Sequence, residues 1–251
     1  MKTLKVFKWL FIVLSIMGVA AAITALSIYR LNFSNIRQDA IAFTTYQLAD
    51  SVALDTINLT VQHANVRIET HSGLDVRVLN STRGEVGNAL NNSTLSVIVY
   101  TARRVVISPH VVTLQIPQNF NGTLNVVVQD DGNLTLQEVH VETLSLSVHD
   151  GAVQANRMSG QSLRVVSNSG NINVRRANFN SVNMLAYNGN TRLEMIGETN
   201  NFTKTLQHRR GGNSTINGVR TTQETVGDGD GVVNLTAPRG NNTLTFIPAI
   251  P

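Results

Sequence analysis

Glycines recur at a fixed interval in the second half of the sequence, and this interval limits the folds that the chain can adopt. The first four are spaced by 19 residues, and the next two follow after 23 and 19 more. They are Gly132, Gly151, Gly170, Gly189, Gly212 and Gly231. Two and four residues after each glycine the positions are mostly apolar, as at Leu134, Val153 and Ile172. The chain therefore contains a structural repeat of about 19 residues.

A unit of this length cannot bury its own apolar face, so successive units must stack on one another. At ~3.3 Å per residue, 19 residues trace a closed path of roughly 60 Å, with room for two or three short strands. Period-2 alternation begins near Asp55, as in INLTVQHANVRIET. We therefore predict an all-β fold, a single-stranded β-helix or solenoid over residues 55–251, with a β-sandwich as the alternative.

The repeat also predicts details of each coil. The glycine column fits a corner that requires positive φ. Asparagines follow several of the glycines and are expected to form a ladder; they are Asn133, Asn171, Asn190 and Asn213. The four extra residues between the fourth and fifth glycines are expected to bulge out as a loop within residues 200–210.

The amino terminus predicts a membrane anchor. Residues 9–29 carry no charged side chain and, as a helix at ~1.5 Å per residue, would span a hydrocarbon core of about 30 Å. Trp9 and Tyr29 would lie at the two interfaces. The preceding segment, residues 1–8, contains Lys2, Lys5 and Lys8. The positive-inside rule therefore predicts a single-pass protein of the cell membrane, with a cytoplasmic basic stub and an extracellular remainder.

Two features of this region leave alternatives open. Small residues at Ala20, Ala21, Ala22 and Ala25 would suit cleavage of a secretory signal peptide instead of an uncleaved anchor. Residues 30–54 mix polar and apolar side chains without Gly or Pro, and we interpret them as a linker that is either a short helix or an extended stalk.

Composition excludes several classes of function. Of the 20 Lys and Arg residues three precede the apolar segment, which leaves 17 against 16 Asp and Glu, so the body is nearly neutral and binding to nucleic acid is not expected. The chain has no cysteine and therefore no disulfide or thiolate chemistry. The sequence contains no nucleotide-binding, serine-hydrolase or zinc-protease motif, so we expect neither an enzyme of a familiar kind nor a cofactor.

Several segments carry a resemblance to a known family. They are INLTVQHANVRIETHSGLDVRV, VVTLQIPQNFNGTLNVVVQDDGNLTL with its Pro117, and the turns SGNINV and DGNLTL. Over about residues 55–248 the sequence resembles the bacterial candidate adhesins of the DUF4097 type. The resemblance implies a right-handed β-solenoid on the outer cell face and brings no catalytic residues. The C-terminal end lacks an LPxTG sequence, so the membrane segment is expected to provide the attachment.

One corner of the predicted stack gathers side chains that carry chemistry. Asp131 and Asp150 precede adjacent turn glycines, with Asp130 and His149 beside them. Stacking would bring these carboxylates and the imidazole together, as a calcium site or as an acid/base pair acting on sugar. Asp before Gly is also ordinary turn chemistry facing water, and we favour that interpretation. The sequence DGDG at residues 228–231 is likewise interpreted as a plain loop.

Charged side chains on another face are expected to fix the register of the coils. Glu138 would lie over Arg157, and Arg175 over Glu194, as ion pairs between neighbouring coils. Three pairs of arginines could also contact anionic wall polymers, although a solvated face is the simpler interpretation. They are Arg103 and Arg104, Arg175 and Arg176, and Arg209 and Arg210.

These patterns favour a non-catalytic surface protein, an adhesin or an envelope-associated binding or structural module. Its expected partners are the membrane and either an envelope polymer or a surface protein. The alternative is a β-helix enzyme that cleaves polysaccharide, or a calcium-binding surface protein. Self-association through the end coils is a third hypothesis, unless the apolar tail at residues 246–251 caps one end.

Overall fold

A computed structural model describes residues 44–50, 54–73, 75–80, 85–100, 111–208, 212–221 and 225–248. In these residues the secondary structure is β-strand, apart from turns and one 3-10 turn at Thr199–Asn201, which confirms the all-β class. The predicted basic stub (1–8) and membrane helix (9–29) lie outside the described residues. Within the part that is described, no helix has the length and apolar character needed to cross a membrane.

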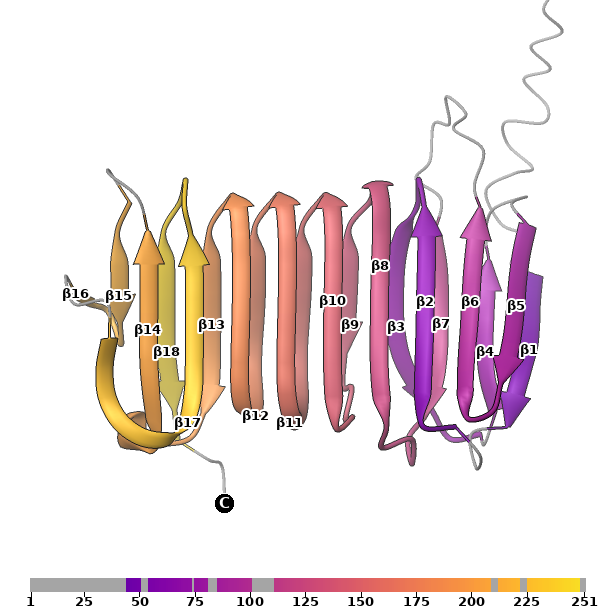
Figure 1. Ribbon diagram of the computed structural model, residues 1–251, viewed down its shortest axis with the longest axis horizontal. Coiled ribbons are helices and arrows are strands. Elements are labelled where there is room, and N and C mark those ends of the chain that lie inside the picture. The colour runs from indigo at the N-terminus through magenta and orange to yellow at the C-terminus, as the bar shows by residue number, and fades with distance from the viewer. Residues whose placement is uncertain are drawn as a thin grey trace, which may run out of the picture. The chain divides into compact units, whose positions relative to one another are not determined.

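The described strands number 18, and they join into a single sheet that folds into two faces (Figure 1). Their bounds are β1 Thr44–Asp50, β2 Thr56–Gln62, β3 Asn65–His71, β4 Asp75–Asn80, β5 Glu85–Asn91, β6 Thr94–Tyr100, β7 Val111–Pro117, β8 Thr123–Asp131, β9 Leu134–Gln137, β10 Thr143–Asp150, β11 Val153–Ser169, β12 Ile172–Asn188, β13 Thr191–Ile196, β14 Phe202–His208, β15 Ser214–Ile216, β16 Val219–Thr221, β17 Thr225–Ala237 and β18 Asn242–Ile247.

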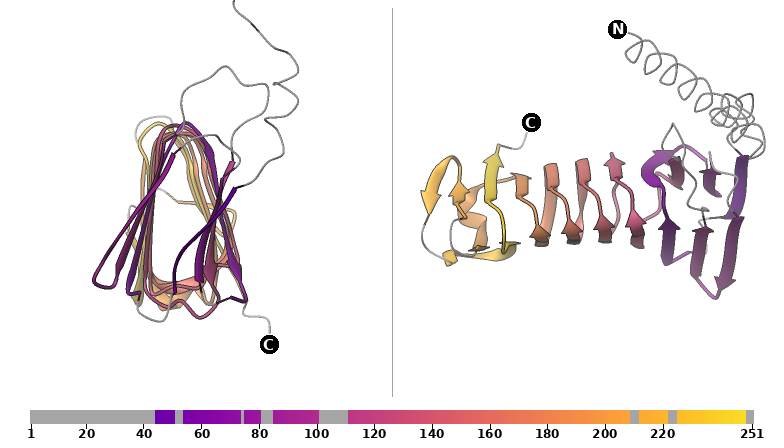
Figure 2. Two further views of the ribbon diagram at one scale, coloured as in Figure 1. Left: turned by 90° about the vertical axis from the view of Figure 1, so that its right-hand side faces the viewer. Right: turned by 90° about the horizontal axis from the view of Figure 1, so that it is seen from above.

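Each coil contributes one strand to each face, and neighbouring coils pair in parallel. Face A consists of β6, β2, β8, β10, the second halves of β11 and β12, β17 and β14. Face B consists of β7, β3, β9, the first halves of β11 and β12, β13, β18 and β15. Seen end-on, the two faces enclose a narrow interior (Figure 2). The architecture is therefore solenoid-like.

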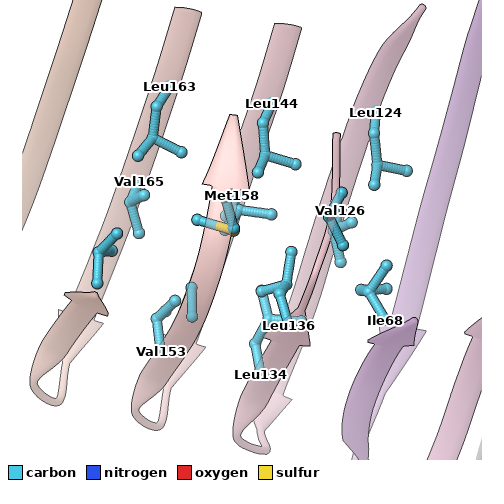
Figure 3. Packing of buried hydrophobic residues seen from close by; sticks show 14 of the residues in the cluster. Ile68, Leu124, Val126, Leu134, Leu136, Leu144, Val153, Met158, Leu163 and Val165 are labelled. Carbon is cyan, nitrogen blue, oxygen red and sulfur yellow. The ribbon is translucent and has the colours of Figure 1, made fainter. Parts of the chain in front are cut away.

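The 19-residue period sets the register of the central coils. Leu134 pairs with Val153, and Val153 with Ile172, so the columns predicted from the glycine alignment lie next to one another. Their alternate residues point inward and are buried, as Figure 3 shows for Leu134, Leu136 and Val153 on one face and for Leu144, Leu163 and Val165 on the other. The hydrophobic effect acts on every coil through these columns and holds the stack together.

The turn glycines are required mainly by close approach rather than by positive φ. A Cβ on Gly151, Gly170 or Gly189 would lie 2.0–2.1 Å from the carbonyl oxygen of the glycine one coil earlier, so no side chain fits there. Two of these glycines, Gly151 and Gly170, do have positive φ. Left-handed backbone also occurs at a different corner, at Glu138, Arg157 and Arg176, with φ between 53° and 57°.

The prediction that Gly231 continues the column of turn glycines is wrong. Gly240, not Gly231, continues the column, since its Cβ would lie 2.0 Å from the Gly189 oxygen, while Gly212 approaches Gly240. Gly231 instead lies against the Phe202 ring. The spacing of 19 between Gly212 and Gly231 is therefore not a repeat.

An asparagine ladder runs along the turn edge, as predicted, with members that the sequence alignment missed. In each rung a side-chain Oδ1 accepts a hydrogen bond from the backbone N–H of the next coil, at 2.8–2.9 Å. The order in space is Asn65, Asn133, Ala152, Asn171, Asn190, Asn241 and Asn213. Ala152 interrupts the ladder because it has no side-chain oxygen.

The N-terminal end of the stack departs from a β-helix. Here β4 pairs antiparallel with β7 and β1, and β5 pairs antiparallel with β6. Strand β1, Thr44–Asp50, falls inside the predicted linker, so the strand-bearing part begins before Asp55. Antiparallel strands thus lie next to the first parallel coil, at the position where a further parallel coil would otherwise pair with it.

The C-terminal coils are not stacked in chain order. Strand β17 lies between β12 and β14 on face A, and β18 lies between β13 and β15 on face B. The last coil therefore occupies the space between two earlier ones. The prediction of a bulged loop within residues 200–210 is wrong for Phe202–His208, because these residues form strand β14 beside β17.

Candidate binding site

The predicted carboxylate corner exists, but its imidazole comes from a different residue. Asp131 and Asp150 are partners in the register between β8 and β10. His63 lies beside them, with Nδ1 2.7 Å from Asp131 Oδ1 and Nε2 3.3 Å from Asp130 Oδ2. His149 instead has its Nδ1 2.9 Å from the Asn168 amide. The corner is thus held by a contact between residues far apart in sequence.

The carboxylates of Asp130 and Asp131 at this corner already have a partner, the His63 ring, and the residues form turns of the chain. His63 and Asp130 both have positive φ, at 50° and 61°, so each turns the chain sharply. The imidazole joins the two turns through the Asp130 and Asp131 carboxylates. Within the described residues, no group of three or more His, Cys, Asp or Glu side chains is placed to hold a metal ion.

Face A is flat and almost uncharged. Along its central outward row the only charged side chain is that of Arg164, and the row reads Ser96, Asn58, Asn125, Ser145, Arg164, Asn183, Asn234 and Thr205. Amide pairs link the coils here, as where Asn125 Nδ2 donates to Asn58 Oδ1 at 2.8 Å. The hydrogen-bonding capacity of this face is therefore partly used within the face itself.

Face B carries charge and is hollowed. A shallow groove of about 750 Å³ crosses β9, β11, β12 and β13. Its outward side chains stand in two rows, one with Thr135, Gln154 and Asn173, and the other with Gln137, Asn156 and Arg175. Arg176 and Glu194 complete the lining. The groove thus offers amides, guanidinium groups and a carboxylate, all held on strands.

One of the two predicted ion pairs on this face is formed and the other is not. Arg157 Nη2 lies 2.9 Å from Glu138 Oε1, which confirms that pair. The predicted Arg175–Glu194 pair is wrong, because the register between β12 and β13 shifts between Val174 and Ala177. There Arg175 and Arg176 of β12 both lie opposite Glu194 of β13, as in a β-bulge, and neither forms an ion pair with it among the described residues.

A buried lysine at the C-terminal end was missed from the sequence. Lys204 occupies an inward position of β14 opposite Val233 and is only 1% exposed. Its Nζ donates a hydrogen bond to the Thr199 carbonyl at 2.6 Å and lies 5.9 Å from the centre of the Phe246 ring. Burial lowers the pKa of this amine, and the negative charge of Asp228 opposes that effect.

The signal for this lysine was present in the sequence FTKTLQ, where alternation places Lys204 among inward residues. It lies in the coil of β14 and β15, which forms one end of the stack. Its aliphatic stem continues the apolar column, while its ammonium group finds a carbonyl and a ring face at the end of the core.

The stacked parallel coils and the apolar interior between two sheet faces define a solenoid-like β protein. The profile of the Toastrack DUF4097 family matches residues 54–228, which are more than half of the chain, and the chain belongs to this family.

Solved structures support the same fold. The chain is similar to a candidate cell adhesion protein from Clostridium sporogenes, with a TM-score of 0.52 and 9% identity, over 82% of this chain and 100% of that one. A candidate adhesin from Bacteroides fragilis matches with a TM-score of 0.44 and 12% identity, over 82% of this chain and 96% of that one. At such identities only the fold is shared, and the second match is too distant to carry an argument. No curated protein matches the sequence.

Proposed function

We propose that this chain is a non-catalytic binding module of the cell surface, a right-handed β-solenoid held in the membrane by residues 9–29. The observation that carries the proposal is the groove on face B, where polar side chains from successive coils face outward together. Strands with a common core hold these side chains at fixed positions, which lowers the entropy lost when a ligand binds. The fold shared with a candidate cell adhesion protein supports a role in contact between the cell and its surroundings.

The location is tested with cysteine labelling, because the chain has no cysteine of its own. Asn183→Cys on face A is exposed, and Thr3→Cys precedes the apolar segment. In intact cells that express the full chain, a membrane-impermeant maleimide is expected to label Asn183→Cys and to leave Thr3→Cys unlabelled until the cells are lysed. The reverse pattern, or equal labelling of both, contradicts the proposed orientation.

Binding without cleavage is tested by electrophoresis of the full chain in detergent through gels that contain single polysaccharides, neutral and acidic. We expect one or more of them to retard the protein without the appearance of new reducing ends. Production of reducing ends that stops in Asp150→Asn would instead establish the sugar-cleaving alternative at the Asp131/Asp150 corner. Retardation by none of the polysaccharides would turn the search toward protein ligands.

A further inference from the structure

The groove on face B contains two arginines that form no ion pair within the described residues. Neither Arg175 nor Arg176 forms an ion pair in the described part of the chain, although Arg157, one coil earlier, pairs with Glu138 at 2.9 Å. The register shift after Val174 sets both arginines opposite one residue of β13, Glu194, so the two guanidinium groups exceed the nearby carboxylate by one positive charge. Two guanidinium groups on a rigid bulge are therefore available to bind a carboxylate, which arginine contacts in a bidentate manner.

A second, independent feature, an acceptor without a partner, indicates that the ligand carries a hydrogen-bond donor. The Oδ1 atom of Asn173, in the same groove, is buried and has no hydrogen-bond partner. A buried acceptor without a donor is costly, so a ligand hydroxyl that bonds to this oxygen once the Asn173 side chain turns toward the groove would remove that cost. The same groove supplies further amides at Gln154 and Asn156.

The carboxylate of Glu194 narrows the choice of ligand. It lies in the groove with the arginines and would repel a ligand that carries negative charge at every position, such as a nucleic acid. It would accept hydrogen bonds from hydroxyl groups. The site thus requires a ligand with isolated negative charges and many hydroxyls.

We propose, on the basis of the proposed binding function, that this groove binds an acidic saccharide, a sugar chain whose carboxylates contact Arg175 and Arg176 while its hydroxyls contact Asn173, Gln154 and Glu194. The rows of the groove come from successive coils spaced by about 4.8 Å, so three coils cover about 10 Å, the length of a short run of sugar units. The sugar chain then lies across the strands, along the axis of the stack.

The test uses the full chain in detergent and, as probe, an oligogalacturonate of defined length, with binding measured by calorimetry. The same oligomer with all carboxylates methyl-esterified is the matched ligand without charge. We expect Arg175→Gln to weaken binding of the acid by about tenfold or more, because a hydrogen bond between charged groups is lost. Asn173→Leu removes the unpartnered acceptor and should weaken binding of both forms of the oligomer.

The matched protein control is Arg164→Gln. This exposed arginine lies on β11, the neighbour of the strand that carries Arg175. It faces outward on face A, away from the groove, and its loss should leave binding of the acid unchanged. An equal loss of binding in Arg164→Gln and Arg175→Gln would reveal only nonspecific attraction and would overturn the proposal. Equal binding of the acid and its ester would overturn it too.

Two further outcomes separate this site from the proposed function. Polyphosphate that binds as tightly as the uronate, with the same dependence on Arg175, would assign the groove to a phosphate polymer and refute the acidic saccharide. Binding of a neutral polysaccharide in the gel assay, with no binding of oligogalacturonate, would refute the ligand class and leave the surface-binding function intact. Failure of every polymer would refute the acidic saccharide and leave a protein as the ligand of the surface-binding function.

Discussion

The gap in the asparagine ladder at Ala152 can be closed by one substitution. Asn133 Oδ1 accepts a hydrogen bond from Ala152 N at 2.8 Å, and Asn171 Oδ1 accepts one from Asn190 N at 2.8 Å, but alanine offers no acceptor to the Asn171 N–H. Ala152→Asn would supply an Oδ1 atom at the position that the neighbouring rungs occupy. We therefore expect this variant to be more stable than the wild type.

The magnitude follows from the one bond that is added. A hydrogen bond of this kind contributes about 0.5–1.5 kcal/mol, and ordering a partly exposed side chain offsets part of it, which leaves about 0.5–1 kcal/mol. For a chain of this size that corresponds to a rise in Tm of roughly 1–4 °C.

The assay is urea unfolding of the full chain in detergent, followed by far-UV circular dichroism. Ala152→Leu is the matched control, because its side chain is similar in size to asparagine and lacks the acceptor, so it should bring no gain. Asn190→Ala breaks an existing rung, since Asn190 Oδ1 accepts from Asn241 N, and should cost about 1 kcal/mol. If Ala152→Asn is no more stable than Ala152→Leu, the hydrogen bonds of the ladder do not stabilise the stack.

Substitutions at three further sites test other parts of the structure. Lys204→Met should raise the free energy of unfolding by about 1–3 kcal/mol, because an apolar side chain replaces a buried amine. Since burial lowers the pKa of Lys204, the wild type should gain stability as the pH rises toward the unfolded lysine value, and calorimetric melts should show its difference from Lys204→Met shrinking with pH. The hydrogen bonds from Arg77 lower the pKa of Asp75 below 3.8, so they stabilise the fold above that pH and are lost on acidification, and Arg77→Gln should move the midpoint of acid unfolding to higher pH. Gly170→Ala, whose Cβ would meet a carbonyl oxygen at 2.1 Å, should cost at least about 3 kcal/mol in urea titrations, whereas Gly87→Ala, with 3.9 Å to its nearest neighbour, should be nearly neutral.

The central coils were predictable because one short period controls both the turn and the core. Between Gly132 and Gly189 each residue packs against its counterpart 19 positions away, so the alignment places Leu134, Val153 and Ile172 in one column. The same reasoning failed at Gly231, where a spacing of 19 arose by coincidence and the true neighbour of Gly189 is 51 residues further on. Periodicity does not reveal a coil that is inserted out of order.

The candidate sites were predictable to a smaller extent. His63 reaches Asp131 across 68 positions, a separation that bears no relation to the repeat. Stacking correctly indicated the Glu138–Arg157 pair, yet it also suggested Arg175–Glu194, because a one-residue shift in register cannot be seen in the alternation of apolar and polar residues. The unpaired arginines of the groove are thus a consequence of tertiary structure.

The insertion of the last coil between two earlier ones has a consequence for how the chain matures. During synthesis from the N-terminus, the coil that carries β14 and β15 is complete before β17 and β18 exist, although these are the strands with which it pairs in the finished stack. Either its apolar residues are exposed until the final segment arrives, or it first occupies the place that β17 later takes. A nascent or proteolytically shortened chain that ends before Thr225 would therefore lack an interior layer rather than an outer one, and would expose apolar surface that favours aggregation.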